Sequence, residues 1–467
     1  MAAQLHVIQP PHATAHSRQA TILVEQANSL PPEFKANSLL RIADSALITD
    51  PVWKRHLLED AFWAATRAQL PFHQIADRAD SVPTRTFRAN DLETLTLQTH
   101  AVESLLAMDA GAALRLDEQI NLNMPVLSSC SDVNTPDISA YYRTAAAIFE
   151  HGFSPKQKEE EADIDFLKQR VTAMVSPSQV ADVFRMVLSA KTSREQKAML
   201  LATFAGALEH VSGPDRDYGA TERSLVPLPA ENLPDMTVVM PSLRAYIVRQ
   251  SSQRRCADNI PAAGNLPKAA IQFNALAAAL DPAGEQYKAI TLNEVKPAAD
   301  DGTYSSQLLW QSPQSRQLLA ALQWLHHGNR GVPGNLKEWT LEERSTDEWL
   351  THYRDTLKLL DAWKVEDEKS AAASFCMLTD AYDDLAILAP PGPIRERAMS
   401  SYLAFLEQRY ADIEIHNLWF TQFRQMLYQA RFSKYAREKQ WILNSLVRSS
   451  NPIIALYAKL EMVLGPP

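Results

Sequence analysis

Residues 36–69 carry apolar side chains at the spacing of an α-helix that is buried on one side. The stripe divides at Asp50, whose carboxylate can accept hydrogen bonds from the first amides of a second helix, and Pro51 suits that helix's first position. The second stripe consists of Val52, Leu57, Leu58, Ala61, Phe62 and Ala65. Two later joints repeat the capping residue and proline, at Ser176-Pro177 and Asn451-Pro452. The pattern predicts helices joined by short proline-containing turns.

Residues 371–389 form another stripe when placed on a helical wheel. Its apolar members are Phe375, Leu378, Tyr382, Leu385, Ala386 and Ala389. Asp380, Asp383 and Asp384 fall outside this arc, so the wheel places the acids on a solvated face. The run Pro390-Pro391-Gly392-Pro393 must end the helix, because residues before proline are forced out of helical geometry. The stretch is therefore interpreted as a joint between two helices, and a metal or acid–base site is the alternative.

The same block resembles known proteins. FCMLTDAYDDLAILAPPGPIRERAMSSYLAFLEQ, together with NPIIALYAKLE near the end, is similar to bacterial helical proteins with no assigned function. The resemblance rests on these two stretches and implies a repeat-like helical fold without catalytic residues. The likeness to tetratricopeptide repeats is architectural, because their Trp-Leu-Gly-Tyr core is absent.

Helix–joint–helix units without strands predict an all-α fold. We expect a helical-hairpin array, α-solenoid-like and elongated, with a proline-rich irregular middle region. That middle region holds seven prolines, and seven of the nine tryptophans follow residue 304. The predicted organisation is a disordered tail (1–20), an N-terminal helical segment (21–212), a proline-rich linker or long loop (213–268) and a Trp-rich C-terminal helical segment (269–467).

The composition excludes several classes of protein. Glycine contributes only 13 of 467 residues, about 3% where about 7% is usual, which disfavours doubly wound sheets and phosphate loops. The net charge of −9 disfavours nucleic acid as a partner. Three widely spaced cysteines cannot build a disulfide framework or a zinc knuckle by themselves. The sequence shows no HExxH, Walker, GxGxxG, GxSxG or EF-hand motif, so no cofactor and no metal are predicted.

No run of apolar residues is long enough for a membrane span. The first residues, MAAQLHVIQPPHATAHSRQ, lack the positive cluster and the unbroken apolar stretch of a secretory signal. The expected location is the cytoplasm, and export is expected only if a leader has been removed ahead of Met1.

Three groups of side chains are candidates for chemistry or binding. His326 and His327, with His352 further on, can act as acid–base groups, although histidines at a helix end are also favoured by the helix dipole. Aromatic residues can line a binding pocket, although aromatics at helical spacing usually form core; they are Trp339, Trp349, Tyr353 and Trp363. Four arginines can hold a phosphate or an acidic peptide, or form a solvated surface; they are Arg244, Arg249, Arg254 and Arg255.

The repeated helix pairs and the lack of a catalytic motif favour a non-enzymatic scaffold that binds a protein or peptide. Because the chain is acidic, we expect a basic or amphipathic partner. The alternative is an all-α enzyme whose acid–base pocket lies in the C-terminal half.

Overall fold

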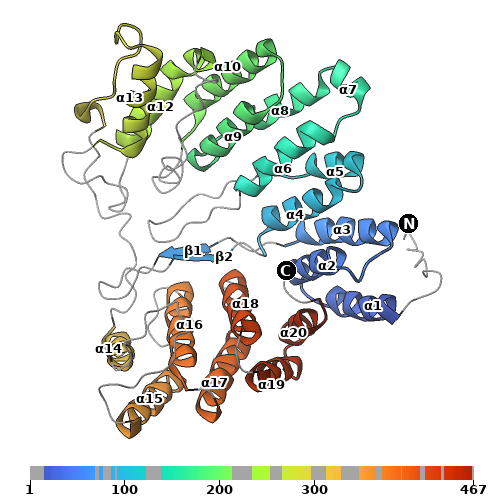
Figure 1. The fold of residues 1–467 in the computed structure, drawn as a ribbon, viewed down its shortest axis with the longest axis vertical. Helices are drawn as coiled ribbons and strands as arrows, with labels where there is room; N and C mark the ends of the chain where they lie inside the picture. Colours follow the sequence, from blue (N-terminus) through green and yellow to red (C-terminus); the bar gives the residue numbers. More distant parts are fainter. Residues whose placement is uncertain are drawn as a thin grey trace.

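The residues that the computed structural model describes make up most of the chain. They are 15–68, 73–76, 86–89, 92–122, 138–212, 234–252, 266–295, 312–327, 346–363, 371–390, 392–410, 416–432 and 436–464. Within them the fold is all-α apart from one short antiparallel pair of strands (Figure 1). The predicted all-α class is confirmed.

The elements of the first part of the chain pack largely on their sequence neighbours. They are α1 (Ala15–Asn28), α2 (Pro32–Ala43), α3 (Pro51–Ala65), β1 (His73–Ala76), β2 (Thr86–Ala89), α4 (Thr94–Leu106), α5 (Ala110–Asp117), α6 (Ile138–His151), α7 (Pro155–Glu159), α8 (Ala162–Thr172), α9 (Pro177–Ser189), α10 (Arg194–His210), η2 (Pro234–Val238), α12 (Met240–Ser252), α13 (Lys268–Leu280) and η4 (Leu292–Glu294). The two strands pair with His73 opposite Ala89.

The second part consists of helices alone within the described residues. They are α14 (Pro313–His327), α15 (Thr346–Asp361), α16 (Ala371–Leu388), α17 (Pro393–Arg409), α18 (His416–Phe432), α19 (Ala436–Val447) and α20 (Pro452–Leu464). Figure 1 shows the chain curving from α1 to α13 and then returning through α14 to α20, so that its last helix lies beside its first two.

The predicted helix joints are confirmed by their caps. Asp50 accepts a hydrogen bond from the Val52 amide at 2.9 Å, which satisfies one of the free amides at the start of α3. Ser176 and Gln179 form a capping box at the start of α9. Asn451 accepts a hydrogen bond from the amide of Ile453 at 2.9 Å and so begins α20. The second stripe is buried as predicted except for Val52, which lies in the first turn of α3 and is 62% exposed.

The joint between α16 and α17 is also confirmed. α16 ends at Leu388 and α17 begins at Pro393, while Gly392 between them has a φ of +111°, which side chains other than glycine rarely adopt. All six residues of the predicted α16 stripe are buried.

The prediction that the α16 acids face solvent is wrong. Asp380 and Asp383 are only 7% and 6% exposed. The reason is that α16 contacts α14, α15, α17 and α18, so neighbouring helices cover both of its sides. A wheel drawn for one apolar stripe cannot predict this second covered side.

The proline-rich region continues the packing of the helices before it. Residues 213–233 and 253–265 lie outside the described residues, whereas η2 and α12 between them pack on α10. α13 then packs on α12. In the region predicted as a tail, residues 15–20 belong to α1, and residues 1–14 lie outside the described part.

The end of the chain packs against its beginning through polar and charged contacts. α20 contacts both α1 and α2. Arg41 and Glu461 form an ion pair at 3.3 Å, with side chains only 12% and 9% exposed, and burial lowers the pKa of Arg41. The Tyr457 hydroxyl donates to Asn37 Oδ1 at 2.8 Å. The end of the chain therefore returns to its beginning, which it would not do in an open elongated rod.

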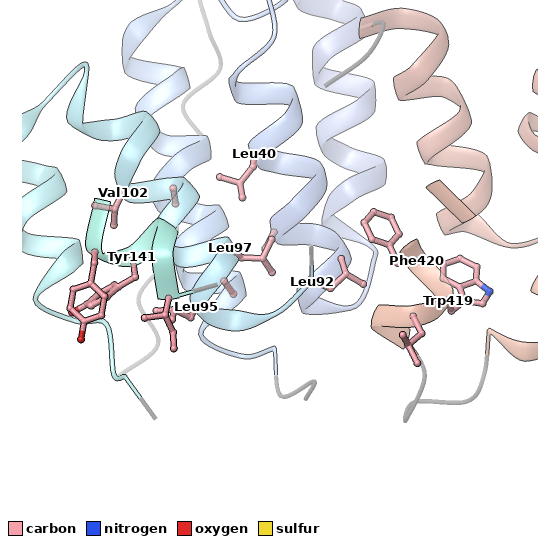
Figure 2. Close-up of a cluster of buried hydrophobic side chains, with 14 of the residues drawn as sticks. Leu40, Leu92, Leu95, Leu97, Val102, Tyr141, Trp419 and Phe420 are labelled. Atoms are coloured by element: carbon pink, nitrogen blue, oxygen red, sulfur yellow. The ribbon is translucent and has the colours of Figure 1, made fainter. Parts of the chain in front are cut away.

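Aromatic packing completes this contact between the two ends, called here the closing interface (α1 and α2 with α18 and α20). The buried Phe34 ring of α2 meets Trp419 and Phe420 of α18 at centroid distances of 6.0 and 5.6 Å, both edge-on. Figure 2 shows Trp419 and Phe420 in the same buried cluster as Leu40 of α2 and Leu92, just before α4. The first and second parts of the chain thus share one hydrophobic core.

Candidate functional site

The histidine candidates do not converge on one site. His326, near the end of α14, lies 3.2 Å from Asp384 of α16 (Nε2 to Oδ2). The His352 ring of α15 instead packs against Trp324, with ring centroids 3.8 Å apart. His327 is the last residue of α14, and its side chain lies outside the described part. Among the described side chains of these three candidates, only His326 forms an imidazole–carboxylate pair.

Two of the aromatic candidates are core residues. Trp349 is fully buried and donates from Nε1 to the carbonyl oxygen of Leu325 at 3.3 Å. Tyr353 is also fully buried and donates to the carbonyl oxygen of Leu385 at 2.8 Å. Both side chains thus join α15 to its neighbours and lack the exposed surface that a partner needs. Trp363 is partly buried against the core, and Trp339 lies outside the described residues.

The two described arginine candidates bind the protein's own backbone. Arg244 donates to the carbonyl oxygen of Lys288 at 2.8 Å and pairs with Glu294 at 2.7 Å. Arg249 donates to the carbonyl oxygens of Leu208 and Val211, near the end of α10. These contacts tie α12 to α10 and to the segment after α13. They occupy the guanidinium groups that an anion site would require.

The other two arginine candidates, Arg254 and Arg255, lie outside the described residues.

Glu294, the partner of Arg244, has an unusually low pKa. The hydrogen bond from Arg244 is the largest cause, followed by the amide and hydroxyl of Thr291, and together they lower the pKa of Glu294 to about 2. The carboxylate is therefore charged throughout the physiological pH range, and its ion pair with Arg244 links η4 to α12.

The two buried acids of α16 act electrostatically on a buried tyrosine of α17. Tyr402 of α17 is fully buried, and its hydroxyl donates to Gln422 Oε1 at 3.4 Å. Burial first, and then the charges of Asp383 and Asp380, raise the pKa of Tyr402 well above its ordinary value. A tyrosine that stays protonated in this way cannot act as a base near neutral pH.

A surface hollow of about 120 Å³ lies between α17, α18 and α19, and it is called here the α17–α19 hollow. Its floor is apolar and buried, and consists of Met399, Met426, Ile442 and Leu446. Its rim consists of Ser400, Leu403, Ala404, Glu407, Trp441 and Ser445. Among the described residues of the lining, Glu407 is the only ionisable one. This arrangement suits an apolar group accompanied by a positive charge.

The hollow was not predicted from the sequence, and the spacing of its rim residues on α17 is the one feature there that is visible in the sequence. On α17, Ser400, Leu403, Ala404 and Glu407 recur at the spacing that lines up one helix face. Within α17 alone this face is an ordinary mixture of polar and apolar residues. It becomes a hollow only because α19 packs on α17 and supplies Trp441 and Ser445 as the other wall.

No group of three or more potential metal ligands occurs among the described residues. Within the same residues, none of the helices combines the length and apolar content that a membrane span requires. The chain matches no protein-family model, no curated protein and no solved structure. The site is therefore interpreted from its own geometry.

Proposed function

We propose that this protein is a non-enzymatic scaffold of stacked helix pairs that binds a protein or peptide through the α17–α19 hollow. One observation carries the proposal: the hollow is open to solvent, has an apolar floor and contains a single carboxylate. Such a site offers burial of an apolar side chain and one orienting charge, which is how helical scaffolds recognise peptides.

The arrangement of the helices supports the scaffold half of the proposal. Successive helices pack mainly on near neighbours in sequence, from α2 on α3 to α19 on α20. A solenoid-like array of this kind presents its outer helix faces over a large surface. Contact between α20 and α2 holds that surface in a fixed curve, so a binding face would be formed before a partner arrives.

An acid–base enzyme is the second candidate, and the His326–Asp384 pair is the observation that favours it. The carboxylate can orient the imidazole, as in many hydrolytic sites. A catalytic site also needs a further group that meets the reacting atom. His352, the other candidate whose side chain is described, packs its ring against Trp324 instead. The α17–α19 hollow includes neither histidine, so the two candidates are tested at different places.

The test compares affinity capture by three forms of the tagged full-length chain from lysate of its native cells. They are the wild type, Ala404→Trp, which fills the hollow without changing charge, and Ala278→Trp. The last is a matched control, because Ala278 is also an exposed helical alanine but lies on α13. Equal thermal stability of the three forms is checked first.

We expect one stoichiometric partner to be retained by the wild type and by Ala278→Trp and lost by Ala404→Trp. Equal capture by all three forms, or no enrichment even with crosslinking, would reject the hollow as the binding site. In that case, screening of metabolites against wild type and His326→Ala would test the enzyme candidate.

A further inference from the structure

We infer that the α17–α19 hollow binds one amphipathic α-helix that inserts a large aliphatic side chain and places a lysine or arginine against Glu407. This inference rests on the proposed function and names the chemistry of the partner.

The size of the hollow limits the inserted group to a single side chain. Its volume is about 120 Å³, whereas an engineered cavity of about 150 Å³ binds one benzene molecule. A leucine or methionine side chain therefore fills it, whereas a folded surface or a bulky cofactor does not. Met399 and Met426 in the floor suit this role, because methionine adapts its shape to the group it contacts.

The shape of the rim favours a helix over an extended peptide. One wall is a face of α17 and the other is a face of α19, where Trp441 and Ser445 are one turn apart. A third helix can pack its ridge of side chains into a groove between two helices. Ser400 and Ala404 are small and exposed, so the backbone of that helix can approach α17 closely. An extended peptide would gain no backbone pairing here, since both walls are helices.

The carboxylate of Glu407 favours a positively charged partner. Its carboxylate accepts a hydrogen bond from the Ser449 hydroxyl, which in turn accepts from the Asn451 amide at 3.1 Å. These contacts fix the carboxylate at the rim. Among the described residues its second oxygen, Oε2, has no hydrogen-bond or ion-pair partner. A half-buried carboxylate without a counter-charge favours a cation over a neutral or negative group.

The test uses two fluorescent synthetic peptides, each about 18 residues long so that helix formation is measurable. Both have the same leucine face, and one has lysines and the other glutamates on the polar face. Binding is measured by fluorescence anisotropy to the wild type, Ala404→Trp, Glu407→Gln and two matched controls, Ala278→Trp and Glu285→Gln. Glu285 is an exposed glutamate after α13, so its neutralisation changes the net charge equally.

We expect the lysine peptide to bind the wild type and both controls with equal affinity. Glu407→Gln should weaken it about five-fold, the effect of one partly exposed ion pair, and Ala404→Trp should weaken it more than ten-fold. Equal binding of the glutamate peptide, or equal weakening by Glu285→Gln, would overturn the inference by showing non-specific attraction. Unchanged binding to Ala404→Trp would overturn it as well.

The two proposals fail in distinguishable ways. If Ala404→Trp loses a cellular partner while neither peptide prefers the hollow, the scaffold proposal stands and the helical, basic partner is wrong. If the lysine peptide binds at the hollow but no cellular partner is lost, the hollow has the inferred chemistry and the proposed function is wrong.

Discussion

Replacement of Phe34 by alanine tests whether the closing interface holds the two ends of the chain together. Phe34 is fully buried in α2 and meets Trp419 and Phe420 of α18 at 6.0 and 5.6 Å. A buried phenylalanine ring covers roughly 150–250 Å², worth about 4–6 kcal/mol at ~25 cal/mol per Å². The alanine methyl group keeps part of this, and measured Phe→Ala changes are about 3–5 kcal/mol. We therefore expect a loss of about 4 kcal/mol.

The assay is native-state hydrogen exchange followed by mass spectrometry, which reports each helix separately. A loss of about 4 kcal/mol raises the equilibrium constant for opening about a thousand-fold, and exchange through that opening becomes faster by the same factor. Phe34→Ala should therefore accelerate exchange in α2 and also in α18 and α20, which are distant in sequence. A matched control is Phe184→Ala, because Phe184 is buried in α9 and stacks on Phe204 at 5.0 Å. It should leave α20 unchanged. Faster exchange in α2 with unchanged exchange in α18 and α20 would show that Phe34 does not hold the two ends of the chain together.

Three smaller predictions concern single local features. Glu294→Gln should reduce the loss of folding stability between pH 4.5 and about 2. The lowered pKa of Glu294 contributes stability that is complete above its ordinary pKa of 4.5 and is lost as the pH falls toward about 2. Urea unfolding across this pH range measures the change. Gly392→Ala should destabilise the α16–α17 joint by about 1–3 kcal/mol because of the φ of +111°, and an unchanged thermal midpoint would contradict this. Asp50→Ala should cost about 1 kcal/mol through loss of the α3 cap, whereas Asp50→Asn, which keeps the cap, should be nearly neutral in the same thermal scan.

Local chemistry made most helix joints predictable from sequence. Asp50-Pro51, Ser176-Pro177 and the turn before Pro393 each carry their own signal, because a cap or a proline acts on residues a few positions away. Helical periodicity also placed the buried stripe of α16 correctly.

Contacts between distant segments were not predictable in this way. Arg41 and Glu461 are 420 positions apart, and nothing in the periodicity of α2 or α20 indicates that they pair. A single apolar stripe implies one covered face and so predicts that Asp380 and Asp383 face solvent, yet several helices enclose α16. The unpredicted ion pair and the wrong placement of the two aspartates both result from tertiary packing.

The predicted site residues show the same limit. Trp349 and Arg244 belong to residue types that often bind ligands, but in the fold Trp349 is a core residue and Arg244 forms an ion pair with Glu294. The α17–α19 hollow could not be predicted, because its two walls come from helices that are separated by α18. Only their packing brings Leu403 and Trp441 to one rim.

Site-specific photo-crosslinking tests the proposed binding site most directly. A photoreactive amino acid replaces Ser400 at the rim of the hollow in the full-length chain, and Ala278 on α13 in the control. Each form is irradiated in native cells, and crosslinked peptides are identified by mass spectrometry. We expect position 400 to capture one defined helical segment with a basic residue beside a leucine or methionine, and position 278 not to capture it. The same products from both positions, or none from position 400, would contradict it.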